Sequence, residues 1–140
     1  MTVTLFLMVF LGILFMAGTA HAAIHKKDTL ISLDKKELGG GKGIVEGFYA
    51  FTRDMPPKDH AIKEVGWLTL QPGHSIGLHR HETNEDMYVI VSGTGLFTDV
   101  DGTEHSVAPG DVTICRKSQS HALVNNGTEP LVFISVIAEQ

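Results

Sequence analysis

The chain has 140 residues, which is enough for one globular domain and too few for two independent cores. Apolar residues make up 43% and charged residues 19%, the composition of a folded protein and not of a disordered one. The formal net charge of −5 and the absence of a basic run argue against binding to nucleic acid or to anionic lipid. One cysteine can form neither an internal disulfide nor a cysteine-rich zinc site, so the eight histidines carry most of the chemical interest.

Residues 1–22 have the form of an export signal peptide. An uncharged apolar run covers residues 5–15, and Ala20 and Ala22 follow in the Ala-x-Ala arrangement of a cleavage site. The run is shorter than the about 20 apolar residues of a spanning helix. We expect cleavage near Ala22, export to the periplasm or out of the cell, and no stable membrane span afterwards. No Lys or Arg precedes the run: a misassigned start would explain this, and an uncleaved membrane anchor is the alternative.

Residues 23–61 are predicted to be an N-terminal arm with short strands at residues 29–33 and 44–51. Between these strands, the run Gly-Gly-Gly-Lys-Gly at 39–43 has a slight likeness to a phosphate-binding loop. Such a loop needs Lys followed by Ser or Thr at the start of a helix, and here a strand-like run follows instead. We interpret residues 39–43 as a flexible turn.

From residue 62 to 138, short β-branched and aromatic runs alternate with turn signals. The clearest turn is Asp101-Gly102, a pair that closes hairpins because both positions favour a positive φ. No helical period is sustained in this segment. Many short strands predict an all-β fold, either a closed barrel or a double-sheet jelly roll. The expected strands are residues 63–71, 75–81, 86–92, 95–100, 103–107, 112–115, 121–124 and 131–138.

The histidines predict a metal site in this barrel. His79 and His81 are two apart in an expected strand, so both side chains leave the same face. A carboxylate begins the next strand, and His121 follows His81 by about forty residues at the start of another strand. Three imidazoles and one carboxylate that meet at one point suit Fe(II), Mn(II), Ni(II) or Zn(II), and they leave one or two coordination positions open.

These residues resemble the two motifs of the small single-domain cupins, the cupin type-2 conserved-barrel superfamily. The first motif runs from Gly through His-x-His and an acid to a second Gly, and its spacing is kept by Gly73, His79, His81, Asp86 and Gly93. The resemblance covers about residues 62–138. It implies the cupin double-stranded β-helix, a jelly-roll barrel, with His79, His81, Asp86 and His121 as the metal ligands.

The second motif runs from Gly through Pro, Gly and His to Asn. Its spacing is kept by Gly110, Arg116, Ser118, His121 and Asn125. Three residue types depart from the family pattern across the two motifs: Asp86 replaces Glu, Arg116 replaces Pro and Ser118 replaces Gly.

The carboxylate ligand has two candidates. The motif spacing favours Asp86, whereas Glu85 has the residue type of the family. A shift by one residue would turn Tyr88 and Ile90 outward, which also favours Asp86. The shorter side chain of Asp86 leaves open a water-bridged acid beside a site of three histidines.

Other residues of chemical interest are expected to have structural roles or to face solvent. Tyr88 shares the face of Asp86 and is the one candidate acid or base. Cys115 is interpreted as a small buried hydrophobic residue, and Trp67 and Phe133 as core or cavity-mouth residues. We expect surface positions for His25, His60, His74, His105 and Arg80, and a turn role for Asn125.

The resemblance implies a metal-dependent enzyme of the dioxygenase, isomerase or decarboxylase type that acts on a small oxygenated molecule. The alternative is a non-catalytic protein that binds or stores a small ligand, a sugar or a metal. Small cupins usually form homodimers, and the strand-like arm from Asp28 onward could pair with the sheet edge of a neighbour. A sensor coupled to DNA binding is set aside, because no helix-turn-helix segment is present.

Overall fold

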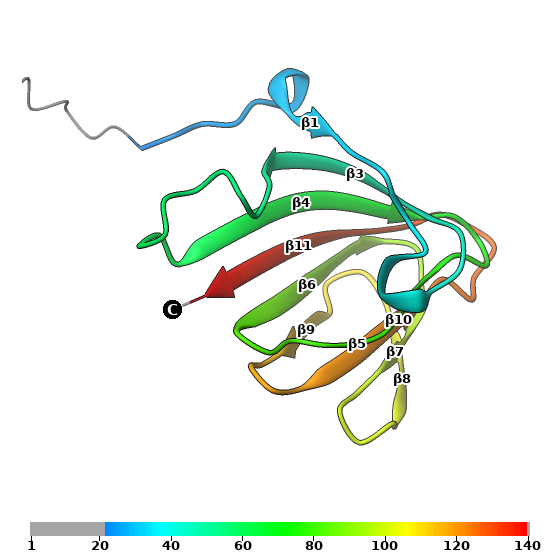
Figure 1. Ribbon diagram of the computed structural model, residues 1–140. Coiled ribbons are helices and arrows are strands. Elements are labelled where there is room, and N and C mark those ends of the chain that lie inside the picture. The colour runs from blue at the N-terminus through cyan, green and yellow to red at the C-terminus, as the bar shows by residue number, and fades with distance from the viewer. Residues whose placement is uncertain (1–21, 140) are drawn as a thin grey trace, which may run out of the picture.

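The computed structural model describes residues 22–139, so the predicted signal peptide lies outside the described residues except for Ala22. These residues form eleven strands and two 3-10 turns, η1 (Lys27–Thr29) and η2 (Leu38–Gly40) (Figure 1). The strands make two antiparallel sheets, and the predicted all-β jelly-roll barrel is confirmed. Within residues 22–139, no helix has the length and apolar content needed to cross a membrane.

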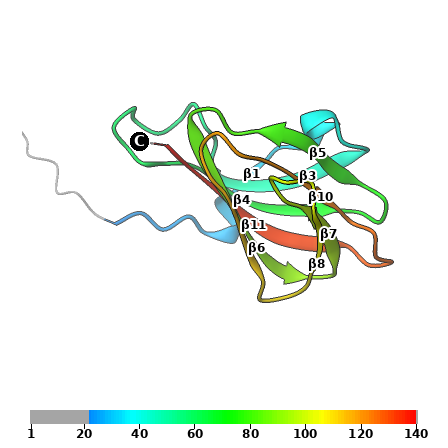
Figure 2. The ribbon, with the colours of Figure 1, turned by 90° about the horizontal axis from the view of Figure 1, so that it is seen from below.

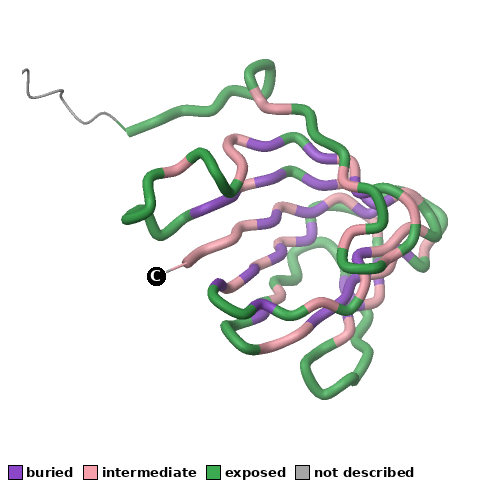
Figure 3. Tube along the Cα trace, viewed as in Figure 1, coloured by how far each residue is buried: buried purple, intermediate pink, exposed green. Residues whose placement is uncertain are grey.

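The larger sheet has seven strands. In spatial order these are β1 (Ile31–Ser32), β3 (Ile44–Phe51), β4 (Ile62–Leu70), β11 (Leu131–Glu139), β6 (Asn84–Ser92) and β9 (Val112–Cys115), with β2 (Lys35–Lys36) also paired to β3. Buried and more exposed residues alternate along the long strands, as Figure 3 shows for the whole trace. This alternation marks a sheet with one face on the core.

The smaller sheet has four strands. Their spatial order is β5 (Ser75–Arg80), β10 (Ser120–Val124), β7 (Gly95–Thr98) and β8 (Glu104–Val107). This sheet lies against one side of the larger sheet (Figures 1 and 2). The core between the sheets consists of Val45, Tyr49, Leu68, Leu70, Ile76, Tyr88, Ile90, Phe97, Val107, Leu123, Leu131 and Phe133.

The segment 23–61 is more closely integrated than an arm. Strand β3 pairs with β4 from Val45 opposite Leu70 to Phe51 opposite Val65, so the sheet continues across the expected boundary at residue 62. Strands β1 and β2 pair with β3 of the same chain. The barrel therefore includes residues on the N-terminal side of position 62.

The run 39–43 is not a free turn, which corrects the expectation from its composition. The backbone N–H of Lys42 donates to Ser75 Oγ, and the N–H of Ser75 donates to the Lys42 carbonyl, both at 2.8 Å. The N–H of Ile44 donates to Nδ1 of His74 at 3.2 Å, so His74 also has a structural contact instead of a purely solvent-facing role. These bonds fix the segment along β5.

Trp67 is the clearest error in the predicted core. Its side chain is 45% exposed, because it alternates with the inward-facing Gly66 and Leu68 on β4 and so lies on the outer face of the larger sheet. Phe133 is fully buried as expected. The apolar sequence of β4 did not show which set of alternate residues faces the core.

Candidate metal centre

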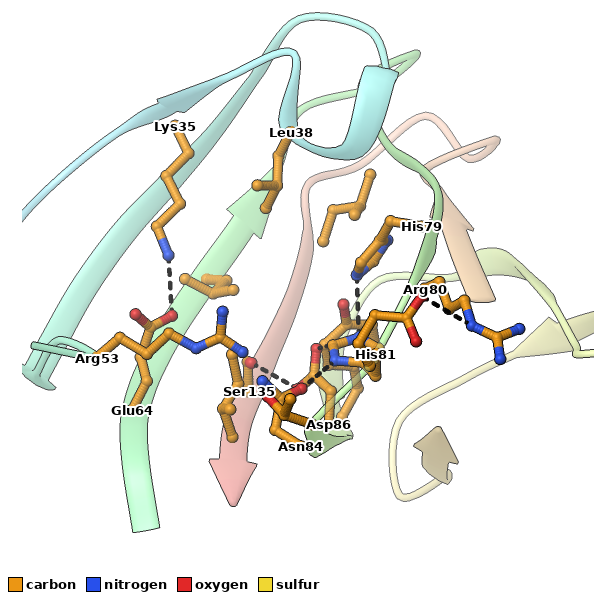
Figure 4. Close-up of a pocket in the computed structure, with 16 residues that line it drawn as sticks. Lys35, Leu38, Arg53, Glu64, His79, Arg80, His81, Asn84, Asp86 and Ser135 are labelled. Atoms are coloured by element: carbon orange, nitrogen blue, oxygen red, sulfur yellow. Dashed lines mark hydrogen bonds and ion pairs between the residues drawn. The ribbon is translucent and has the colours of Figure 1, made fainter. Parts of the chain in front are cut away.

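Four side chains that are distant in the sequence meet between the two sheets. They are His79 on β5, His81 directly after β5, Asp86 on β6 and His121 on β10. One ligand atom from each lies within 4.8 Å of the other three. Three of the four, His79, His81 and Asp86, line a cavity and are labelled in Figure 4. The structure thus brings together the four residues expected to hold a metal.

Strand pairing explains the convergence. His79 and His121 are directly opposite in the β5–β10 pair, so their side chains share the inner face of the smaller sheet. On β6 the residues Asn84, Asp86 and Tyr88 are all buried, since alternate residues face the core. The carboxylate therefore reaches the imidazoles from the opposing sheet.

Hydrogen bonds fix the orientation of two of the rings. Nδ1 of His81 lies 2.6 Å from Asn84 Oδ1, and Nδ1 of His79 lies 2.8 Å from the Gly77 carbonyl oxygen. A carbonyl oxygen only accepts, so each Nδ1 carries the proton and donates it. The Nε2 atoms of both rings then present lone pairs to the centre of the cluster, as expected of metal-binding histidines.

The spacing of these Nε2 atoms fits a bound cation. Nε2 of His81 lies 3.1 Å from Nε2 of His79 and 3.0 Å from Nε2 of His121. Because Nδ1 carries the proton in both His79 and His81, the contact between their Nε2 atoms brings two lone pairs together, which repel unless a cation lies between them. Metal–nitrogen bonds of about 2.1 Å place neighbouring ligand atoms about 3 Å apart. The donor set therefore fits a divalent transition metal.

Two of the histidines, His79 and His121, have lowered pKa values that favour the neutral form that binds metals. Burial, opposed by the hydrogen bond to Gly77, lowers the pKa of His79 below its ordinary value. Burial, followed by the charges of His79 and His81, lowers the pKa of His121 to about 3. His121 Nδ1 is buried and has no hydrogen-bond partner among the described residues.

Asp86 supplies the negative charge of the cluster. Its Oδ2 lies 3.8 Å from Nε2 of His81 and 3.7 Å from Nε2 of His121, while Oδ1 accepts a 3.0 Å hydrogen bond from Ser135 Oγ. Burial raises the pKa of Asp86 to about 6, and the interactions with Ser135 and Tyr88 limit that rise. A buried carboxylate without a full positive partner favours a bound cation.

Glu85, the other candidate carboxylate, faces away from the cluster. It pairs with Arg116 Nη1 at 3.3 Å on the outer side of the sheet. Successive residues of β6 face opposite sides of the sheet, so Asp86 and Glu85 point in opposite directions. Tyr88 and Ile90 are buried on the same face as Asp86, as the sequence predicted. Asp86 is the acid that faces the histidines.

Tyr88 packs against the cluster through His121. Its ring stacks on the His121 ring with centroids 5.0 Å apart and planes inclined by 23°. Burial, and then the neighbouring Asp86 carboxylate, raise the pKa of Tyr88 well above 10. The phenol therefore keeps its proton at neutral pH, and its visible contribution is to orient His121. A role as acid or base stays a prediction.

A glycine turn contacts His79, one of the candidate metal ligands. Gly39 of η2 has a φ of +62°, and a Cβ added to it would lie 3.2 Å from both Cβ and Cγ of His79. The same Cβ would lie 2.9 Å from the Gly77 oxygen that holds His79 Nδ1. Turn η2 therefore limits the space available to His79.

The cavity above the cluster has a volume of about 360 Å³. Its wall includes charged residues that sequence patterns did not identify, among them Lys35, Arg53 and Glu64. Asn84 and Ser135, which orient the ligands, were also missed. The alternation along the strands could have identified them, because both are polar residues at positions that face the core in otherwise apolar strands.

The remaining candidates have the structural positions expected of them. Cys115 is buried, and burial raises its thiol pKa to about 11, which disfavours a nucleophilic role. Asn125 is fully buried, and its side-chain amide donates to the Glu129 carbonyl four residues on and to the Leu70 carbonyl at the end of β4. Arg80 is exposed and pairs with Glu82. His25, His60 and His105 are outside the cluster.

Comparison with known proteins gives a consistent set of relatives. A cupin domain model matches residues 66–137. The chain is 34% identical over 100 residues to an oxalate-binding protein from Thermotoga maritima, covering 71% of this chain and 80% of that protein. It is 33% identical over 73 residues to a gentisate 1,2-dioxygenase from Ralstonia, covering 52% of this chain but 20% of the dioxygenase.

A solved structure shares the fold over most of the chain. The crystal structure of a predicted oxalate decarboxylase from Thermotoga maritima aligns with a TM-score of 0.75 and 28% sequence identity. The alignment covers 84% of this chain and 100% of that chain. The likeness thus extends beyond the two sequence motifs to the strands that precede residue 62.

Proposed function

This chain belongs to the cupin domain family, and on that basis we propose that it is a metal-dependent enzyme acting on a small oxygenated acid, with oxalate as the first compound to test. The observation that carries the proposal is the convergence of three imidazole nitrogens and one buried carboxylate, in a cluster of which His79, His81 and Asp86 line a cavity. The names of two relatives, an oxalate-binding protein and a predicted oxalate decarboxylase, support the choice of acid.

The size and lining of the cavity fit a small ligand. Its volume of about 360 Å³ is at the lower end of ligand pockets in proteins. Leu68, Ile76 and Ile137 contribute apolar wall that excludes water, and the cluster supplies the polar end. A small acid fits within this volume beside the cluster.

Two groups of residues would have different roles in this function. His79, His81, Asp86 and His121 would hold the ion, and Asn84, Ser135 and Tyr88 would keep these ligands oriented. A bound divalent ion would supply Lewis acidity to a carboxylate or carbonyl oxygen of the substrate. A donor set of three nitrogens and one oxygen suits Fe(II), Mn(II), Ni(II) or Zn(II).

Non-catalytic binding of the acid is the second candidate function. The relative named an oxalate-binding protein favours it. The Tyr88 phenol, whose raised pKa holds its proton, is also a poor proton donor for turnover. Both candidates use the same metal and cavity, so they differ only in whether the bound acid is converted.

The test loads the purified protein with each of the four ions and measures oxalate binding by calorimetry and conversion by release of formate and carbon dioxide. Oxygen uptake with a dihydroxybenzoate tests the dioxygenase possibility that the gentisate dioxygenase suggests. Saturable binding with turnover supports the enzyme. Binding without turnover of any acid supports the second candidate, and no binding with any ion contradicts both.

We also propose a homodimer through the outer face of the larger sheet. Residues paired across adjacent strands form an apolar row: Phe48, Trp67, Ile134, Val89 and Val112. Phe48 is 51% exposed, and Val112 at the other end is 54% exposed. A two-fold axis through the middle of the row would place the aromatic end of one copy on the aliphatic end of the other. This self-complementarity favours a second copy as the partner.

Export remains a proposal based on the sequence of residues 1–22. The apolar run and the Ala-x-Ala site support a cleaved signal peptide. Sequencing the amino terminus of the protein recovered from its host would test it: a mature chain that begins near Ala23 supports export with cleavage, and an intact leader supports the membrane anchor.

A further inference from the structure

The charged residues of the cavity wall are mostly paired with one another. Lys35 Nζ lies 2.8 Å from Glu64 Oε1, and Arg80 Nε lies 3.0 Å from Glu82 Oε1. All four of these residues line the cavity that ends at the metal cluster. Each pair cancels its own charge, so neither is a free partner for a charged ligand.

Arg53 is the exception among the basic residues of this wall. It lies between β3 and β4 and has no ion pair or side-chain hydrogen bond within residues 22–139. Figure 4 shows its side chain extending across the cavity toward Ser135 and Asn84, the residues that orient Asp86 and His81. A guanidinium placed there without a partner is available to an anion.

The charge balance of the cavity sets the class of that anion. Apart from the two internal pairs, the wall contributes the positive charge of Arg53 and the negative charge of Asp86. A divalent ion at the cluster adds two positive charges, so the loaded cavity has an excess of two. A small dianion neutralises this excess, whereas a monoanion leaves one positive charge unbalanced.

We infer that Arg53 is a specificity-determining residue for small dicarboxylates and donates to the carboxylate oxygens that face the cavity mouth. The guanidinium presents paired N–H groups that match a carboxylate in a bidentate arrangement. The inference rests on the proposed function, since it assumes that the cavity binds an acid beside the ion. The inference names the residue that would make the cavity prefer dicarboxylic acids to monocarboxylic acids.

The experiment compares Arg53→Gln with Lys58→Gln in the metal-loaded protein. Lys58 lies on the same β3–β4 connection, carries the same charge and does not line this cavity, so its variant controls for long-range electrostatics. Calorimetry measures the dissociation constants of oxalate and malonate, both dianions, and of acetate, a monoanion, at fixed ionic strength. Elemental analysis measures the metal content of each variant.

We expect Arg53→Gln to keep its metal and to bind oxalate or malonate at least about tenfold more weakly, the loss typical of a charged hydrogen-bonding group. Acetate binding should change much less, so the preference for dianions should fall. Arg53→Lys should recover part of the affinity, and Lys58→Gln should resemble wild type.

Three results would overturn the inference while leaving the proposed function intact. These are unchanged dianion affinity in Arg53→Gln, an equal loss in Lys58→Gln, and a wild type that prefers acetate to both dianions. Loss of metal from Arg53→Gln would overturn it too, since Arg53 would then act on the cluster itself. A wild type that holds metal but binds none of the acids contradicts both the inference and the proposed function.

Discussion

His81 and His121 are forty residues apart in the chain, yet their Nε2 atoms lie 3.0 Å apart. Asn84 holds the other nitrogen of His81 at 2.6 Å, so the lone pair of Nε2 points at His121. Nε2 of His79 also has a free lone pair, because its Nδ1 donates to the Gly77 carbonyl, and it lies 3.1 Å from the same nitrogen of His81. A cation that binds these nitrogens removes the repulsion between the two lone pairs.

The two neighbouring acids of β6 should differ sharply in metal binding. Asp86→Asn should weaken binding of the ion by at least about tenfold, because among residues 22–139 it removes the one carboxylate directed at the histidines. Glu85→Gln should leave the affinity unchanged, since Glu85 pairs with Arg116. Competition with a chelating dye measures both. Equal losses in the two variants would rule out Asp86 as the specific ligand.

Asp86→Asn should also stabilise the metal-free protein at pH 8. Folding raises the pKa of Asp86 from 3.8 to about 6. The folded protein therefore keeps its full stability below pH 3.8, where Asp86 is protonated, and part of the free energy of unfolding is lost as the pH rises through 6. A pKa higher by about two corresponds to a cost of up to about 3 kcal/mol at pH 8. Urea titrations should show a gain of about 1–3 kcal/mol at pH 8 and little at pH 4. A less stable variant at pH 8 would contradict the assigned cost.

Metal binding should weaken as the pH falls below about 6. In the metal-free protein Asp86 takes up a proton near that pH, and the ion must displace it. His121, with a pKa of about 3, stays neutral in this range and does not compete in the same way. Affinity measured from pH 5 to 8 should be flat above 7 and fall by up to about tenfold per pH unit below 6. A flat profile down to pH 5 would be incompatible with Asp86 as a ligand.

Turn η2 should affect the metal site through His79. Gly39→Ala introduces a Cβ 3.2 Å from Cβ and Cγ of His79, so the ring must shift and the affinity for the ion should fall several-fold. Gly40→Ala is a matched control: its φ of +77° gives a similar backbone strain, but its Cβ would meet nothing within 4 Å. The same metal affinity in both variants would show that η2 does not position His79.

The proposed dimer makes a prediction at Trp67. Trp67→Glu places a charge in the aromatic end of the apolar row, so the variant should sediment as a monomer under conditions where the wild type is a dimer. Substituting Val100, an exposed residue outside the larger sheet, by Glu is the control. A monomeric wild type, or a dimeric Trp67→Glu, would exclude this face as the interface.

Much of this site could be predicted from local rules. Two-residue periodicity places His79 and His81 on one face, and the same parity separates Asp86 from Glu85. Spacing within the motif identified His121 although its pairing with His79 is not local. The cluster was predictable because strand alternation and motif spacing place each of the four candidate residues.

The cavity wall was not predictable in the same way. Arg53, Lys35 and Glu64 reach the cavity because β2 and β3 join the larger sheet and the β3–β4 connection returns toward the cluster. Such placement depends on pairings between distant segments, which composition does not reveal. The exposed position of Trp67 has a similar cause, since residue type alone cannot say which face of β4 is covered.

The most direct test of the site is the metal content of the purified protein after loading with each divalent ion and removal of the excess. Wild type should retain one ion per chain, and His79→Ala and His121→Ala should each retain less than about a tenth of that while their β circular dichroism is unchanged. Retention of a full equivalent by both variants, or no retained ion in wild type with any of the four metals, would contradict the metal centre.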